Sequence, residues 1–514
     1  MHQVQRKLFG NAPMYQLVYF RSILFFSLCL ATTSDVVAQK TFEVTQEVRT
    51  CYASVLALNF NETRARLHQI SVDDPDNLMA VYLEDFIDFF TLIISEDRKL
   101  YHVREDDQSR RLELLKKGPE ESPWFRFTRA EVYLHRALLR IKFEEYYSAA
   151  ADINRAFKLL KKNEEEFPDF APTYKSIGIL RMGVGTIPDK YMWAVKLFSS
   201  LEGTIKSGIE NIERSIELGK AQNMLVLREA QYLYAQAIVH FESDPDKAWD
   251  YLNTLQLDAS DNILECFMLA NIAMRTGHND HAIGLLLNKP SGSDIYNIPY
   301  MKLMLGRAYM FRSDENADVP LQDYVNTFEG ENFIKEAYQK LAWYALLNDD
   351  IAGYQSMMDS CLKRGHAVMG EDKNAFIEAS RGKIPNRALL KARLLFDGSY
   401  LVQALDELAL IDQNDLDADG KLEYEYRKAR VLHEMHKYDD AIHHYLTAIE
   451  LGHDSSYYYA CNAALQCGII YEQDGHYEKA EVFFKKCLSM HPDDYQTSLH
   501  QKAKAGLSRL KSAD

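Results

Sequence analysis

The chain has 514 residues and a formal net charge of −16, which argues against a nucleic-acid-binding protein, because such proteins need a basic surface that neutralises phosphates. Apolar residues make up 47% of the chain and charged residues 26%, a balance that excludes a chain disordered throughout. Gly (23 residues) and Pro (13 residues) are scarce for this length, and so few turn-forming residues favour helices.

Residues 1–38 have the pattern of a secretory signal peptide. Basic residues precede an apolar run at 22–33, which is too short to span a bilayer. Val36 and Ala38 are the small residues expected before a cleavage point, so we predict an exported chain whose signal is cut near Ala38. An uncleaved membrane anchor and a lipoprotein processed at Cys29 are the alternatives. We expect no transmembrane segment in the mature chain.

The segment 39–220 is predicted to form divergent helical repeats. Residues 41–77 have the length of one helical pair, which Pro75 would end. Apolar residues recur at helical spacing in four later stretches, at 78–95, 123–162, 171–182 and 203–218.

Small residues then recur with a period of roughly 34–39 residues, which is typical of stacked helical pairs rather than of separate globular domains. Units begin near residues 229, 263, 299 and 335 in a central array (221–363), and near 385, 422 and 461 in a C-terminal array (385–514) that ends in a capping helix. Two segments, 290–299 and 364–384, interrupt the period, and each is predicted to be a linker or a loop that carries a site.

The unit at 461–494 has the clearest pattern. Gly468 and Ala480 are small enough for two helices to cross closely, Gly475 permits a tight turn, and Pro492 would end the second helix. Aromatic residues are expected to fill the seam between neighbouring pairs, at Tyr471, Tyr477 and Phe484.

This pattern resembles the tetratricopeptide repeat, a helix–turn–helix unit of 34 residues. The resemblance implies an all-α, right-handed superhelical solenoid of antiparallel helix pairs, and with the signal it is similar to an exported bacterial member of that superfamily. The order of Gly178, Ile187-Pro188, Gly203 and Gly208 also resembles the eukaryotic inclusion-body-clearance family of repeat proteins, which again implies helical repeats.

In the tetratricopeptide family, positions 2, 5, 9 and 12 of each first helix line the concave face of the array. These positions hold Asn386, Leu389, Arg393 and Phe396, then Glu423, Tyr426, Arg430 and His433, then Asn462, Leu465, Ile469 and Glu472. The resemblance implies that these residues take an extended peptide, foremost Asn386, Arg393, Phe396, Tyr426, Arg430, His433, Asn462 and Glu472. The alternative is a solvated inner face with no ligand.

One loop has the spacing of a calcium site. Asp415, Asp417, Asp419 and Gly420 match positions 1, 3, 5 and 6 of a D-x-D-x-D-G loop, but position 12 lacks the bidentate carboxylate. A weak calcium site is one interpretation. The favoured one is a structural turn between two repeats, in which Asp419 caps a helix that begins near Leu422.

Six cysteines follow the signal, and an even number in an exported chain permits disulfides. We favour buried free thiols instead, because free cysteine packs as a small hydrophobe.

The sequence contains no phosphate-binding loop and no serine-hydrolase elbow. We therefore predict a non-enzymatic scaffold without a cofactor, which binds a protein or peptide partner in the periplasm or at the cell envelope. The alternative is a glycan- or nutrient-binding protein of a bacterial outer membrane built on the same helices, and an enzyme centred on one of the two interrupting segments is a third reading.

Overall fold

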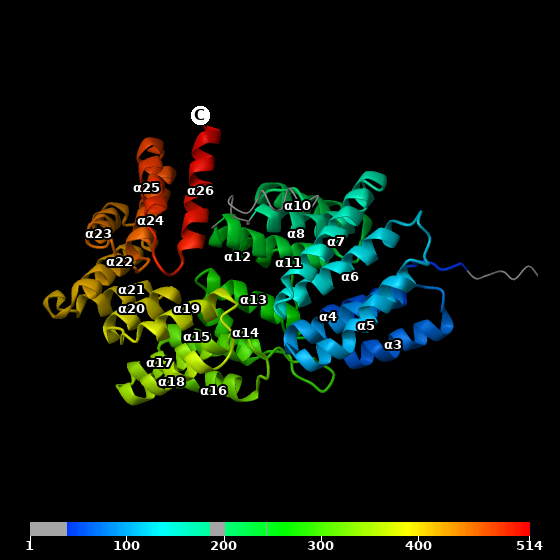
Figure 1. Cartoon of the computed structure of the whole chain (residues 1–514), viewed down its shortest axis with the longest axis horizontal. Helices are drawn as coiled ribbons and strands as arrows, with labels where there is room; N and C mark the ends of the chain where they lie inside the picture. Colours follow the sequence, from blue (N-terminus) through cyan, green and yellow to red (C-terminus); the bar gives the residue numbers. More distant parts are fainter. Residues whose placement is uncertain (1–38, 186–200, 243, 514) are drawn as a thin grey trace, which may run out of the picture.

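Figure 1 shows the computed structural model, which describes residues 39–185, 201–242 and 244–513. Regular structure in these ranges is helical, apart from one isolated bridge between Thr41 and Asn77. Successive helices pack as antiparallel pairs along the chain, so the predicted all-α solenoid is confirmed. None of the described helices has the length and apolar character needed to cross a bilayer. The predicted signal lies outside the described residues.

The N-terminal part begins with short helices and continues with longer pairs. Its helices are α2 (Gln46–Leu56), α3 (Phe60–Asp73), α4 (Met79–Ser95), α5 (Arg98–Leu115), α6 (Pro123–Lys142), α7 (Tyr146–Glu166), α8 (Ala171–Gly185) and α10 (Ile205–Gln222). The predicted helices at 41–77, 78–95, 123–162, 171–182 and 203–218 are all present. Helices α8 and α10 cross closely at Gly178, where a Cβ atom would lie 2.9 Å from the carbonyl oxygen of Gly208.

The central part continues the same arrangement. It consists of α11 (Leu227–Ala237), the π-helix η1 (Ile238–Glu242), α12 (Pro245–Asn253), α13 (Ile263–Arg275), α14 (Asn279–Leu287), α15 (Tyr300–Arg312), α16 (Asp318–Thr327), α17 (Ile334–Leu347) and α18 (Ile351–Lys363).

Residues 364–384 were expected to be a linker or a loop, but most of them form helix α19 (Gly370–Arg381), which packs on α17 and α18. The buried carboxylate of Asp372 explains this position. It accepts hydrogen bonds from the backbone N–H groups of Phe333 (2.5 Å) and Glu336 (3.0 Å), which belong to the start of α17 and lack partners within that helix. The segment therefore caps a neighbouring helix.

The C-terminal part is the most regular. It consists of α20 (Arg387–Asp397), α21 (Leu401–Ala409), the 3₁₀ turn η2 (Gln413–Asp415), α22 (Ala418–Glu434), α23 (Tyr438–Leu451), α24 (Tyr459–Gln473), α25 (Tyr477–Ser489) and the capping helix α26 (Gln496–Ala513).

The predicted register of the last unit holds in most details. A Cβ atom at Gly468 would lie 2.6 Å from the Phe484 ring, Ala480 is fully buried, and Gly475 has a φ of +76°. The prediction for Tyr477 is wrong: it begins α25 and its side chain is 46% exposed, so it does not fill the seam.

All six described cysteines are buried and free, as favoured from the sequence. Two of them, Cys461 on α24 and Cys487 on α25, have Sγ atoms 3.6 Å apart.

Candidate binding groove

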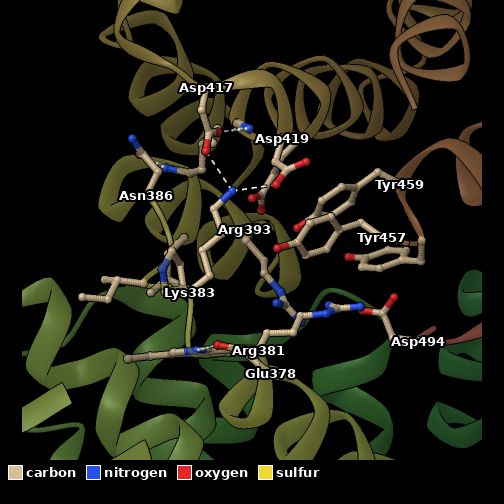
Figure 2. A pocket seen from close by; sticks show the side chains of 18 of the residues that line it. Glu378, Arg381, Lys383, Asn386, Arg393, Asp417, Asp419, Tyr457, Tyr459 and Asp494 are labelled. Carbon is tan, nitrogen blue, oxygen red and sulfur yellow. Dashed lines mark hydrogen bonds and ion pairs between the residues drawn. The ribbon is translucent and has the colours of Figure 1, made fainter. Parts of the chain in front are cut away.

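Two adjoining hollows lie on the first helices of the central and C-terminal repeats. The first has a volume of about 380 Å³ and lies between α17, α19, α20, the start of α22 and the residues just before α24 (Figure 2). The second, of about 580 Å³, lies between α15, α17, α19 and α20, and the connection from α25 to α26 forms part of its wall. Five residues line both hollows and join them into one groove: Gln339, Trp343, Asn374, Arg393 and Tyr495.

Trp343 is held rigidly where the two hollows meet. Its indole N–H donates a 2.7 Å hydrogen bond to Glu378 on α19, and the same carboxylate accepts a 2.6 Å hydrogen bond from Gln339. Two cations lie over the ring: Lys340 Nζ is 3.8 Å from its centroid and the Arg393 guanidinium carbon 4.7 Å. The indole is therefore fixed between charged side chains, and it is only 1% exposed.

Lys383 binds the aspartate-rich turn, which is the predicted calcium loop of Asp415, Asp417, Asp419 and Gly420. Its ammonium group donates hydrogen bonds to Asp417 (2.8 Å) and Asp419 (2.7 Å), as Figure 2 shows. Burial lowers the pKa of Lys383, but these two hydrogen bonds outweigh that effect and raise the pKa overall. A lysine thus already supplies a positive charge to two of the three predicted calcium ligands. The third, Asp415, lies in η2.

The cap of α22 differs from the expected one. Asp417 accepts a 2.8 Å hydrogen bond from the N–H of Gly420, and the helix begins at Ala418 rather than near Leu422. The prediction that Asp419 is the cap is therefore wrong, because the cap is Asp417, two residues earlier, and Asp419 lies in the first turn of the helix. Within the described ranges, no group of three or more His, Cys, Asp and Glu residues is arranged to hold a metal ion.

Arg381 closes the first hollow on the side of the capping helix. Its guanidinium group lies 3.3 Å from the Asp494 carboxylate and 4.4 Å from the centroid of the Tyr457 ring. These contacts join α19 to the connection before α26 and to the residues before α24, so three separate segments share one wall (Figure 2).

The structure brings only some of the predicted groove residues to the hollows. Asn386, Leu389, Arg393 and Glu423 line the first hollow, where Asn386 also caps α20. Tyr426 and Asn462 are buried and paired instead, since the Asn462 amide donates a 2.6 Å hydrogen bond to the Tyr426 hydroxyl.

The remaining predicted groove residues contact their neighbours on the repeats. Arg430 lies over the Phe396 ring at 4.8 Å. His433 lies 3.2 Å from the Tyr445 hydroxyl, and burial lowers the pKa of His433 to about 4. Glu472 pairs with Arg509 of the capping helix at 2.7 Å.

The groove also contains residues that were not predicted. Positions 2, 5 and 9 of the unit near 335 are Glu336, Gln339 and Trp343, and position 9 of the unit near 299 is Arg307. Applying the same position rule to these less regular units would have found them. The α19 residues that line the groove, such as Asn374, lie outside the period and carry no such signal.

The comparison with protein families agrees with the repeat pattern of the C-terminal part. The family model described as tetratricopeptide repeat matches residues 422–493, and the sequence matches no curated protein. The chain is similar to a Rap protein solved with competence and sporulation factor (11% identity over 79% of this chain and 96% of the other, TM-score 0.32). It is also similar to Cut9 in the APC/C Cut9–Hcn1 hetero-tetramer (10% identity over 90% of this chain and 97% of the other, TM-score 0.26). A third similar structure is an IFIT1 monomeric mutant with Gppp-AAAA (13% identity over 86% of this chain and 94% of the other, TM-score 0.28).

Proposed function

Because residues 422–493 are tetratricopeptide repeats, we propose that this chain is a non-enzymatic scaffold that binds a partner protein through an extended peptide segment. The observation that carries the proposal is the continuous groove formed by the two hollows. A groove on the inner face of stacked helical pairs is the surface that such solenoids use for binding.

The side chains of the groove suit a peptide. The amide of Asn374 lines both hollows and has no hydrogen-bond partner in the described part of the chain, so it is available to a peptide backbone. Tyr495, which is 36% exposed, provides aromatic surface at the same junction. A bound segment could therefore satisfy main-chain polar groups and bury a side chain in one place.

Site-specific photo-crosslinking tests this function. A photoreactive phenylalanine analogue replaces Ile384, which lines the first hollow, or Val402, which is 60% exposed on α21 and serves as the control. We expect the Ile384 probe alone to crosslink one defined segment of a protein from the same cells, located by mass spectrometry. Equal labelling from both probes, or none from either, would contradict a peptide-binding groove.

We further propose that the chain works outside the cytoplasm, in the periplasm or at the cell envelope. The support is the signal pattern of residues 1–38, with its small residues at Val36 and Ala38. Sequencing the N-terminus of the protein purified from its own cells should give Gln39 or Lys40. An intact Met1, or a lipid on Cys29, would overturn cleavage near Ala38.

The second candidate is a glycan-binding protein. One observation favours it: aromatic rings gather around the first hollow, and flat aromatic faces can pack on apolar surfaces of ligands. They belong to Trp343, Tyr457, Tyr458, Tyr459 and Tyr495. Retention on envelope polysaccharide that is lost in Tyr457→Ala would favour the glycan, whereas the crosslinked segment above would favour the peptide.

A further inference from the structure

Two cysteines of the last repeat face each other in the core. Cys461 lies in the first turn of α24 and Cys487 in the last turn of α25, and their Sγ atoms are 3.6 Å apart. The exposed fractions of the two residues are 1% and 0%. Because α24 and α25 pack against each other, two helices hold these sulfur atoms in contact.

The other four described cysteines lie apart from this pair. They are Cys51 on α2, Cys266 on α13, Cys361 on α18 and Cys467 further along α24. In the described ranges, the contact between the sulfur atoms of Cys461 and Cys487 is the only one between two cysteines. Oxidation of the folded chain would therefore join one defined pair.

We propose that Cys461 and Cys487 form a disulfide bond when the chain meets an oxidant that itself carries a disulfide, such as oxidised glutathione or a thiol oxidoreductase. The Cys461 thiolate attacks one sulfur atom of the oxidant, and the other half of the oxidant leaves as a thiolate. The Cys487 thiolate then attacks Cys461 in this mixed disulfide and releases the second half. Overall, the two thiols of the chain give up two protons and two electrons, and the disulfide of the oxidant becomes two thiols.

The contact between the two thiols favours Cys461 as the attacking group. A hydrogen bond from the Cys487 thiol stabilises the Cys461 thiolate and lowers the pKa of Cys461, whereas the same contact raises the pKa of Cys487. The thiolate is the nucleophile in disulfide exchange. The second step then needs the two sulfur atoms to approach from 3.6 Å to about 2 Å, the length of the bond.

Helix α26 covers the pair and controls its access to an oxidant. Cys487 Sγ lies 3.9 Å from the carbonyl oxygen of Leu499 on α26. Segments at the end of a chain open at a lower free energy than the core does. The oxidant therefore reaches the thiols when α26 opens, or before this helix packs during folding.

The bond also acts on the groove, because two segments of its wall flank the pair. Residues 457–459 line the first hollow just before Cys461, and residues 494–495 line it after α25. A 2.9 Å hydrogen bond from the N–H of Asp493 to the carbonyl oxygen of Ser456 joins the two segments. A covalent link between α24 and α25 would hold them together more firmly.

Redox titration of the purified mature chain tests the bond. The protein is equilibrated with mixtures of reduced and oxidised glutathione, in buffer and in urea, and its free thiols are then alkylated and counted by mass spectrometry. We expect six alkylated cysteines in the reduced protein and four in the oxidised protein. The bond should be about a hundredfold more favourable in buffer than in urea, because the fold already holds the two sulfur atoms in contact.

Three variants assign the bond to the pair. Cys461→Ala and Cys487→Ala should each abolish it, whereas Cys467→Ala should preserve it, because Cys467 is equally buried on the same helix but has no cysteine beside it. In Cys467→Ala, hydrogen exchange over residues 457–459 and 493–495 should be slower in the oxidised protein than in the reduced one.

Each contrary outcome is distinct. Six alkylated cysteines after equilibration with oxidised glutathione, or glutathione attached to separate cysteines, would overturn the proposal. A bond to Cys467 would overturn the assignment to the pair, and an equal tendency to oxidise in buffer and in urea would mean that the fold does not favour the bond. The photo-crosslinking test of the groove does not depend on this bond, so either proposal can fail without the other.

Discussion

Lys175 on α8 and Lys340 on α17 occupy similar places in the solenoid but have opposite surroundings. Both are nearly fully buried, with exposed fractions of 2% and 8%. Lys175 Nζ lies 2.6 Å from Glu131 and 3.0 Å from Glu229, whereas the carboxylate that Lys340 pairs with, Glu336, is 3.9 Å away. Two close carboxylates thus neutralise Lys175, whereas the close polar contact of Lys340 is the neutral Gln339, whose Oε1 accepts a 2.8 Å hydrogen bond from Nζ.

The same contrast extends along the N-terminal helices. Arg111 on α5 lies 2.6 Å from Asp88 on α4, and Asp85 on α4 lies 2.8 Å from His135 on α6. These pairs join helices that are neighbours in the stack, so they act within the protein. The difference teaches that a buried charge in this solenoid joins helices where its carboxylate partner is close.

The largest effect is expected from Lys175→Met. This change leaves Glu131 and Glu229 buried together without a cation, and breaking a buried ion pair in this way costs about 3–5 kcal/mol. Denaturant unfolding followed by circular dichroism should show the loss, and Lys206→Met, at a side chain that is 88% exposed, should have almost none. Equal stability of the two variants would mean that the N-terminal charges do not hold the helices together.

Lys340→Met should act in the opposite direction. Met fills a similar volume and removes a poorly paired charge, so the free energy of unfolding should stay the same or rise by about 1–2 kcal/mol. A destabilisation as large as that of Lys175→Met would erase the distinction between the two regions.

The pH dependence of stability should differ between the wild type and Lys340→Met. Burial lowers the pKa of Lys340 to about 8, and the nearby charged groups are Glu336 on its own helix, Arg307 on α15, Arg393 on α20 and Glu378 on α19. Above pH 8 the Lys340 ammonium group therefore keeps its proton in the unfolded state but loses it in the folded state. The free energy of unfolding should then rise with pH, by about 1 kcal/mol between pH 8 and pH 9. Thermal unfolding of both proteins at these pH values gives the difference, which should vanish if Lys340 has an ordinary pKa.

The sequence allowed the repeat array to be predicted because each unit repeats its own small and aromatic positions. Asn386 and Arg393 were found for the same reason. Helix α19 was missed because its place depends on Asp372, whose partners at the start of α17 lie 36 and 39 residues away. No local pattern contains such a contact.

A distant contact also explains why the role of Lys383 at the aspartate-rich turn was not predicted. Its spacing was read as a possible calcium loop, but Lys383, the cation that binds two of its carboxylates, comes from a segment 34 residues before Asp417. Sequence spacing shows which carboxylates can converge. It does not show which positive charge the fold brings to them.

The smallest effect is expected from added calcium. This experiment tests whether carboxylates of the C-terminal repeats that already have a close cation leave no room for a second one. Lys383 already bridges Asp417 and Asp419, and position 12 lacks the bidentate carboxylate, so millimolar calcium should stabilise the wild type by less than about 0.5 kcal/mol. Lys383→Met removes the competing cation and should make the melting temperature more sensitive to calcium, while Lys391→Met, which breaks a pair with Glu407 on the neighbouring helix, should not. A shift of many degrees in the wild type, abolished by Asp417→Asn, would instead mean that calcium displaces Lys383 and that this turn has a binding role.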